Sequence, residues 1–437
     1  MTIDSPAPLT WRGTPISAAS IEDAVTALRG VVRRTPLLRN DRLSDLTGAR
    51  VLLKREDLQP VRSYKLRGAY YLISRLSEAE RAAGVVCASA GNHGQGVAYA
   101  CRMLGIRGRV FCPTGTPRQK RDRMRQIGGD WVELVVAGAT YDEAAAAAED
   151  AARADGASLV PAFDDPRTII GQGTVAEEII DQLGASPDVL LVPVGGGGLL
   201  GGVLTWVRER SPRTRVVAVE PAGAASMASA LAAGRPVTLD RVDTFVDGAA
   251  VRRVGDCPLA VAAERPPQMV AVPEGAICSE MLEMYQVDGI IAEPAGALAT
   301  AALRAGFHVE PGSTVVAIVS GGNNDVSRYA EIIERSLVWE GRKHYFLVTF
   351  TQQPGALRTF LDQVLGPEDD IVLFEYVKRN NRDTGPALVG VELAEAADLD
   401  GLLARMAASP IDCQRLTEDS PAYRYLVSGG PGLLGES

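Results

Sequence analysis

The fold of this chain is decided by one stretch, Val192-Pro193-Val194-Gly195-Gly196-Gly197-Gly198-Leu199. It is an apolar strand that ends in four glycines, and an apolar helix begins after them. Successive backbone N–H groups without side chains, at the N-terminus of a helix, form a site suited to a phosphate. A flexible turn is the alternative interpretation. Because such a run of glycines costs chain entropy, we expect another group to approach the backbone there.

Strands and helices alternate on both sides of this stretch. Short apolar strands between amphipathic helices predict an α/β fold with mostly parallel sheets, covered on both faces. Ligands of such sheets bind beyond the carboxyl ends of the strands. Because Asn92, the 195–198 loop and Ser320 each follow a strand, we expect them to converge. The expected strands are residues 51–54, 85–88, 109–112, 131–136, 189–194, 216–220 and 314–319.

Lys65 is the most informative single residue, and it lies in Ser63-Tyr64-Lys65-Leu66-Arg67-Gly68-Ala69. The chain has 45 basic residues but only five lysines. Lys65 precedes an apolar helical segment, where a desolvated amine can lose its proton and act as a nucleophile. A surface lysine at a helix start is the alternative. The other lysines lie in charged or basic surroundings that predict solvated ammonium groups, and they are Lys54, Lys120, Lys343 and Lys378.

A third stretch also follows an apolar strand and opens a helix. Its sequence is Ser89-Ala90-Gly91-Asn92-His93-Gly94-Gln95-Gly96. Because these residues are mostly small, the backbone at this helix start can hold a carboxylate or a ring oxygen. An amine nucleophile together with a phosphate site suggests a phosphorylated aldehyde held as a Schiff base. Pyridoxal phosphate fits that description.

Six segments occur in a specific order, at residues 54–57, 63–69, 89–96, 193–199, 292–297 and 320–323. In that order they resemble the threonine dehydratases, of the tryptophan-synthase-β-like class of pyridoxal-phosphate enzymes (fold type II). Six segments in order are more specific than any one of them. Two departures are mild, because Tyr64 stands where Phe is usual and Gly94 stands where Ala is common.

The resemblance implies pyridoxal 5'-phosphate as the cofactor and assigns residues to it. Lys65 would hold the cofactor aldehyde and then take the substrate Cα proton. Asn92 would bond the ring hydroxyl oxygen, and Ser320 would face the pyridine nitrogen. Because a hydroxyl, unlike an Asp, does not keep that nitrogen protonated, loss of the β-hydroxyl would be favoured over racemisation or transamination. The phosphate would be held by Gly195, Gly196, Gly197, Gly198 and the amide of Leu199.

The resemblance also implies a reaction, that of a threonine ammonia-lyase. L-Threonine would be converted to 2-oxobutanoate and ammonia, the first step of isoleucine biosynthesis. The substrate carboxylate would be received at Ser89, Gly91 and His93, and no metal is expected. L-Serine is expected as a second substrate, because one methyl group is worth only about 1–3 kcal/mol in a pocket. A serine dehydratase or racemase of the same family is the alternative.

Two functions from other classes share parts of this pattern. A dinucleotide-dependent oxidoreductase would also alternate strands and helices, but the glycines form a run instead of the spaced G-x-G-x-x-G. Lys65 would then have no role. A non-catalytic amino-acid sensor would keep the fold without needing Lys65 or Ser320. Both alternatives predict a colourless protein.

The pattern changes after residue 336, where an α+β domain is expected. Residues 345–350, 355–365, 371–377, 387–393, 399–407 and 411–416 predict strand, helix, strand, strand, helix and strand, which is the ferredoxin-like order. This order is similar to the ACT-like regulatory domain of biosynthetic threonine dehydratases. The resemblance implies isoleucine as an allosteric ligand and a homo-oligomer, a tetramer. A dimerisation module without a ligand is the alternative.

The expected domain boundaries follow from these patterns. Residues 1–336 would form the catalytic domain, with a smaller subdomain at roughly 54–160 inserted in the larger one. Residues 337–343 would form a linker, and residues 344–430 the ACT-like domain.

The charge, the cysteine pattern and the apolar stretches of the chain disfavour several partners and locations. A formal charge of −9 and a pI near 5.2 disfavour a nucleic-acid partner. The six cysteines show no CxxC pairing, so reduced thiols and a cytoplasmic location are expected. Residues 1–13 lack a basic leader and an apolar stretch, which predicts no secretory signal. Residues 189–207 carry no charge, but Pro193 and the glycines interrupt them, so no membrane span is expected.

Overall fold

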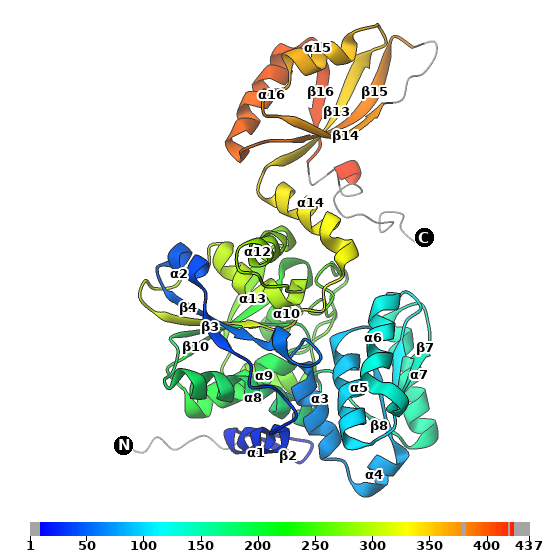
Figure 1. Cartoon of the computed structure of the whole chain (residues 1–437), viewed down its shortest axis with the longest axis vertical. Coiled ribbons are helices and arrows are strands. Elements are labelled where there is room, and N and C mark those ends of the chain that lie inside the picture. The colour runs from blue at the N-terminus through cyan, green and yellow to red at the C-terminus, as the bar shows by residue number, and fades with distance from the viewer. Residues whose placement is uncertain (1–8, 377–381, 418–419, 424–437) are drawn as a thin grey trace. The chain divides into compact units, whose positions relative to one another are not determined.

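The computed structural model describes residues 9–376, 382–417 and 420–423. The chain divides into two compact units, which are drawn in Figure 1. The first contains the chain up to Glu274 together with Glu283–Asn324, and the second contains Gly275–Leu282 and the chain from Asp325 onward. Val377, which was expected to end a strand, and residues 424–430 lie outside the described residues.

The first unit is built on a six-stranded sheet. Five strands are parallel, and the edge strand β3 is antiparallel to β4. Every residue of β9 is buried, as is typical of a parallel strand with both faces covered. Across the sheet the order is β11 (Gln268–Val272), β10 (Arg215–Pro221), β9 (Val189–Pro193), β12 (Thr314–Val319), β4 (Arg50–Arg55) and β3 (Leu37–Arg39).

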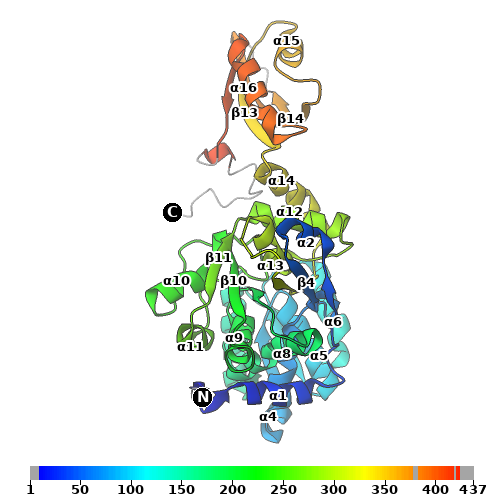
Figure 2. The same cartoon turned by 90° about the vertical axis from the view of Figure 1, so that its left-hand side faces the viewer.

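Helices cover this sheet. Three of them, α1 (Ala18–Leu28), α8 (Pro166–Leu183) and α9 (Gly198–Arg210), share one hydrophobic core with strand residues such as Val192 and Ile318. Figure 2 shows α8 and α9 side by side. Helix α13 (Pro294–Arg304) packs against β9, β10, β11 and β12. The other elements are β1 (Leu9–Trp11), β2 (Thr14–Ile16), α2 (Asp41–Thr47), α10 (Ser226–Ala233) and α11 (Asp256–Glu264). Helix α12 (Glu274–Gln286) is divided between the two units, because Gly275–Leu282 belong to the second.

A smaller sheet of four parallel strands belongs to the same unit. It has its own hydrophobic core, in which Leu72, Val97 and Val110 are buried. In Figure 1 this part is coloured from blue to cyan. Its strands, in order, are β7 (Val132–Val136), β6 (Gly108–Cys112), β5 (Val85–Ala88) and β8 (Ser158–Leu159). Its helices are α3 (Lys65–Ser74), α4 (Glu78–Ala83), α5 (Asn92–Leu104), α6 (Arg118–Gly128) and α7 (Tyr141–Asp155).

The second unit contains a four-stranded antiparallel sheet with two helices on one face (Figure 1). Phe346 from the sheet and Phe360 and Leu402 from the helices form its core. The strand order is β14 (Asp370–Tyr376), β15 (Thr384–Glu392), β13 (Lys343–Thr351) and β16 (Asp412–Arg415). The helices are α15 (Ala356–Gln363) and α16 (Leu399–Ala408), preceded by α14 (Tyr329–Trp339).

The structure confirms the expected fold class and differs in detail. The parallel α/β sheets and the ferredoxin-like order of the C-terminal region are both present. Five short strands had not been expected, namely β1, β2, β3, β8 and β11. Helix α14 continues to Trp339 and β13 begins at Lys343, so the connection is shorter than the expected linker at 337–343. The domain boundaries stay a prediction.

The uncharged stretch at 189–207 is divided between β9 and α9. Within the described residues, no helix is both long enough and apolar enough to cross a membrane.

Candidate active site

Two segments that are far apart in the chain meet at the end of β12. Ser63 and Gly321 form an isolated antiparallel bridge. The amide of Tyr64 donates a hydrogen bond to the carbonyl of Ser320 over 3.2 Å. Lys65, the first residue of α3, is therefore held beside the carboxyl end of β12, where ligands of parallel sheets bind.

The amine of Lys65 contacts a segment that the sequence had not singled out, residues 160–165. Its Nζ donates to the carbonyl of Ala162 over 3.3 Å, and the side chain is half-buried. The next residue, Phe163, packs directly against the glycine loop. Lys65 and the glycine loop thus contact two consecutive residues of this segment.

The glycine loop presents backbone donors without acceptors. The amides of residues 195–199 make no hydrogen bond to any described residue. Residues 196–199 are buried, and Gly197 has the left-handed φ of 93° at the start of α9. Because buried N–H groups without a partner are rare in native proteins, this loop fits a bound anion such as a phosphate.

The protein's own side chains also require glycine in this loop. A Cβ on Gly196 would lie 2.2 Å from Cδ1 of Phe163. A Cβ on Gly197 would lie 2.5 Å from Cε of Met227. The missing side chains are therefore explained by close packing, and the anion site rests on the unpaired amides instead.

The start of α5 arranges further donors. Oγ of Ser89 accepts hydrogen bonds from the amides of Gly91 and Gly94, over 3.1 and 2.9 Å. Its own hydroxyl hydrogen remains available to a ligand. The carboxylate site expected at Ser89, Gly91 and His93 thus has one hydroxyl donor already oriented by the backbone.

His93 is buried beside this helix start. Its Nε2 lies 2.7 Å from the carbonyl of Val160. Burial, and secondly the charge of Lys65, lower the pKa of His93 to about 4. The ring is therefore neutral at physiological pH, with a proton on Nε2 that donates to Val160.

Asn92, also at the start of α5, contacts two residues from distant parts of the chain. Its Nδ2 donates to Oε1 of Glu293 over 2.5 Å, and its Oδ1 accepts from Nδ2 of Asn323 over 2.7 Å. Nearby, Oγ of buried Ser320 donates to the carbonyl of Ala295 over 2.9 Å. The expected convergence of Asn92 with the end of β12 is therefore present in the structure.

A buried cluster of ion pairs includes Arg67, two residues after Lys65, and it contradicts the expectation that Lys54 is solvated. Lys54 had been expected to be solvated, yet it is fully buried and its Nζ lies 2.6 Å from Oε1 of Glu178. Burial lowers the pKa of Lys54, and Glu56 and Glu178 oppose that shift. Arg67 bonds the same two carboxylates. The charged stretch at 54–57 forms a buried network because its two basic partners, Lys54 and Arg67, meet the carboxylates of Glu56 and Glu178.

An open cleft of about 710 Å³ adjoins Asn92 and is lined by several basic and amide side chains. Oε1 of Gln95 and both side-chain polar atoms of Asn324 are buried there without a partner among the described residues. Such groups are ordinarily satisfied by a ligand or by water. The residues that line the cleft are Arg62, Gln95, Gln119, Lys120, Asp122, Arg123, Gln126, Asn323 and Asn324.

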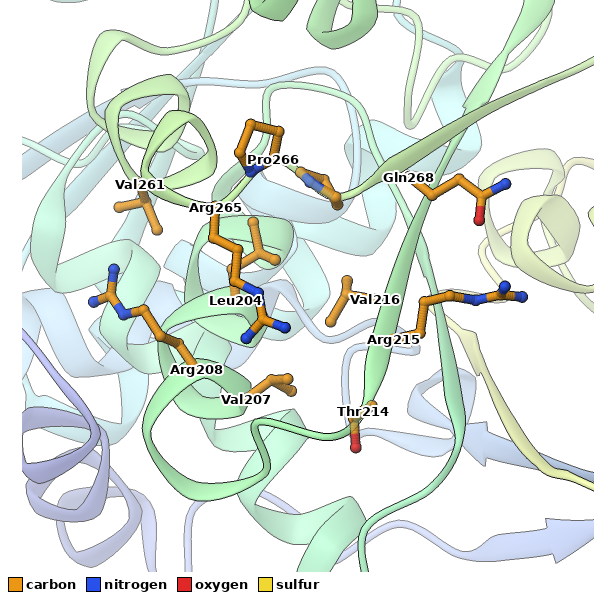
Figure 3. Close-up of a pocket in the computed structure, with 11 residues that line it drawn as sticks. Leu204, Val207, Arg208, Thr214, Arg215, Val216, Val261, Arg265, Pro266 and Gln268 are labelled. Carbon is orange, nitrogen blue, oxygen red and sulfur yellow. The ribbon is translucent and has the colours of Figure 1, made fainter. Parts of the chain in front are cut away.

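A second cavity, of about 140 Å³, lies at the opposite ends of the strands, between the starts of β10 and β11 (Figure 3). Arg208, Arg215 and Arg265 line it. The first two side chains extend away from the third in Figure 3. Arg208 is already paired with Glu264. The three guanidinium groups therefore form no common anion site.

Comparison with known proteins agrees with this arrangement. A model of the pyridoxal-phosphate dependent enzymes matches residues 28–321. The biosynthetic L-threonine dehydratase of Mycobacterium bovis is 62% identical over 414 residues, which are 94% of this chain and 96% of that protein. The chain belongs to the threonine dehydratase family of pyridoxal-phosphate dependent enzymes.

The C-terminal region of this threonine dehydratase family member matches a second model, the C-terminal regulatory domain of threonine dehydratase, over residues 334–426. Among solved structures, the processed form of threonine deaminase isoform 2 from Solanum lycopersicum is similar, with a TM-score of 0.69 and 40% identity, covering 73% of this chain and 87% of that one. Maize serine racemase is similar with a TM-score of 0.68 and 29% identity, covering 74% of this chain and 98% of that one.

Sequence reasoning missed several groups of this threonine dehydratase site. The carbonyls of Val160 and Ala162 hold His93 and Lys65, and backbone acceptors leave no sequence signal. Phe163 was missed as well, although it lies in the crossover from β8 to α8, which must pass the site. Glu293 lies in the family segment at 292–297 and was expected to shape the pocket, but its contact with Asn92 was not expected.

Proposed function

We propose that this protein converts L-threonine to 2-oxobutanoate and ammonia, the first step of isoleucine biosynthesis, with pyridoxal 5'-phosphate as its cofactor. One observation carries the proposal. The half-buried amine of Lys65 contacts Ala162, and the glycine loop with the unpaired amides of residues 195–199 contacts the next residue, Phe163. A phosphorylated aldehyde needs this combination of an amine and a phosphate site.

The bound cofactor would supply an aldehyde that reacts with amines and a ring that accepts electron density from the substrate Cα. Lys65 would hold the cofactor through Nζ. Once the substrate amine has replaced that link, the freed Nζ would take the proton from the substrate Cα. The amides of residues 195–199 would hold the phosphate throughout and so keep the substrate beside Lys65.

The start of α5 would bind the substrate carboxylate. The free hydroxyl hydrogen of Ser89 and the helix-start amides can donate to it, and the helix dipole favours a negative charge there. Neutral His93 would stabilise this turn through Val160 without transferring a proton itself. The roles of Ser89, Gly91 and His93 stay predictions that substitution would test.

L-Serine is proposed as a second, poorer substrate. Threonine and serine differ by one methyl group, and a pocket discriminates between two such substrates by only about 1–3 kcal/mol. The 62% identity to a biosynthetic L-threonine dehydratase favours threonine over serine as the main substrate. Measurement of kcat/KM for both amino acids on one preparation would decide the preference.

The second unit is proposed to bind isoleucine and to regulate the enzyme within a homo-oligomer, a tetramer. Support comes from its match to the C-terminal regulatory domain of threonine dehydratase. A cytoplasmic location likewise stays a prediction, which fractionation of the source cells would test.

The proposed reaction has a direct test. We expect the purified protein to be yellow, to lose this colour on borohydride reduction, and to release 2-oxobutanoate and ammonia in equal amounts from threonine. A colourless protein that gains neither absorbance nor activity on addition of pyridoxal phosphate would contradict the proposal.

A further inference from the structure

Glu293 reaches across the site from the start of a helix. It is the residue before α13, the position where a short polar side chain such as Asp or Ser often accepts hydrogen bonds from the first amides of the helix. The side chain of Glu293 makes no such bond. It is buried, with 5% of its surface exposed, and its Oε1 accepts from Nδ2 of Asn92, 201 residues away.

Asn323 contacts the oxygen end of the Asn92 carboxamide. Its Nδ2 donates both to Oδ1 of Asn92 over 2.7 Å and to the carbonyl of Val61 over 2.8 Å. A backbone carbonyl can only accept, so the nitrogen end of Asn323 is fixed independently of Asn92. The oxygen of Asn92 must therefore face Asn323, and its nitrogen must face Glu293.

We infer that Glu293 is a positioning residue that, together with Asn323, locks the carboxamide of Asn92 so that one N–H remains free for the ring oxygen of the cofactor. The inference rests on the proposed function, because it concerns how Asn92 receives that ring. The carboxamide has two N–H bonds, and Glu293 uses only one of them. Without Glu293 the amide could rotate and present its oxygen, which would repel the ring oxygen.

The carboxylate of Glu293 packs closely against Gly321. A Cβ on Gly321 would lie 2.3 Å from Oε1 of Glu293 and 3.3 Å from Nδ2 of Asn92. Gly321 itself pairs with Ser63 near Lys65. The carboxylate and the carboxamide of Asn92 therefore both lie against the backbone at the end of β12, where a side chain at position 321 would displace them.

The charges around Glu293 make its hydrogen bond to Asn92 depend on pH. Burial, and secondly Asp247, raise the pKa of Glu293 to about 7, while Asn92, Lys120 and the backbone of Asn323 oppose the shift. Above that value the ionised carboxylate accepts strongly from Asn92, and below it protonation weakens the bond. Asp247 and Lys120 pair with each other over 2.5 Å.

The test uses the holoenzyme and reads the cofactor's absorbance. Glu293→Met removes the acceptor at similar volume, and Glu293→Gln removes only the titration. Asn323→Ala releases the other end of the amide. Glu220→Gln is the matched control, because Glu220 is also buried with a pKa raised to about 7 but bonds the amides of Met227 and Ala228 in α10.

We expect Glu293→Met and Asn323→Ala to bind pyridoxal phosphate about tenfold more weakly than wild type and to shift its absorbance maximum. A spectral transition near pH 7 should be present in wild type and in Glu220→Gln and absent in Glu293→Gln. Wild-type affinity and spectra in both Glu293 variants would overturn the inference, and so would loss of the pH 7 transition in Glu220→Gln. In either case, turnover of threonine by the wild-type protein would leave the proposed function intact. A wild-type protein that binds no pyridoxal phosphate would overturn both.

Discussion

Lys65 is the residue on which the proposed chemistry depends, because the other described lysines are engaged elsewhere. Lys54 is buried in an ion cluster, Lys120 pairs with Asp247, and Lys343 pairs with Glu334. The contact of Lys65 with the carbonyl of Ala162 is weak at 3.3 Å. Its amine can therefore react without breaking an ion pair.

The first prediction concerns Lys65→Ala. We expect loss of the visible absorbance of bound cofactor and at least a thousandfold fall in 2-oxobutanoate formation, on the order of 4 kcal/mol in transition-state stabilisation. Lys343→Ala is the control, because Lys343 is also a partly buried lysine and lies in the other unit. Retention of the covalently linked absorbance in Lys65→Ala would show that another lysine holds the cofactor.

Ser320 gives the second prediction. Its Oγ donates to the carbonyl of Ala295, so Ser320→Ala should cost about 1 kcal/mol of stability and leave the fold intact. We expect slower elimination from a less firmly held ring. Ser320→Asp should raise racemisation or transamination relative to elimination, because a carboxylate keeps the facing nitrogen protonated. Product analysis by chiral chromatography checks this, and an unchanged product ratio in the Asp variant would refute the argument.

At the scale of elements, the buried ion cluster ties α3 to α8. Arg67 of α3 contacts Glu56 and also Glu178 of α8, over 2.7 and 2.9 Å. Helices α3 and α8 pack along each other. Since Lys65 begins α3, the ion cluster determines where the reactive amine is held relative to the larger sheet.

The third prediction compares two carboxylates of α8. Glu178→Ala leaves Lys54 and Arg67 with less compensation in a buried site and should lower the free energy of unfolding by about 3–5 kcal/mol. Asp181→Ala, which removes an exposed pair with Arg34, should change it by less than about 1 kcal/mol. Denaturant titration of both variants measures the difference. Equal losses would mean that the buried cluster does not stabilise α3.

At the scale of the whole molecule, the second unit is predicted to make catalysis sensitive to isoleucine. We expect isoleucine to inhibit threonine turnover by the full-length protein, with a coupling free energy of about 1–3 kcal/mol between the two ligands. The control is a chain ended after Glu340. It keeps α14 and the contact of Ser336 with Ser279, and it lacks the sheet that begins at Lys343. Turnover at several threonine concentrations measures the effect, and inhibition that survives the truncation would contradict the prediction.

The strands that carry the site could be predicted because their signal is local. Residues 85–88 and 314–319 are short apolar runs followed by small residues, and the structure has them as β5 and β12 with the expected bounds. Strand β3 has only three residues at the edge of the sheet, and β11 has only one fully buried residue. Strand β3 is too short to show a pattern, whereas β11 contains an apolar run, Met269 to Val272, that sequence reasoning missed.

The sequence by itself determined the parallel α/β class, the ferredoxin-like C-terminal order and the position of the glycine loop, because each depends on residues that are adjacent in the chain, and the same local signal led to the prediction for Lys65. The tertiary structure alone decided what these parts contact. Lys54 is buried instead of solvated because Glu178, 124 residues away, pairs with it. Asn92 is oriented by Glu293 and Asn323, which only the folded chain brings to it. Such contacts depend on how sheets pack, and no local pattern encodes that packing.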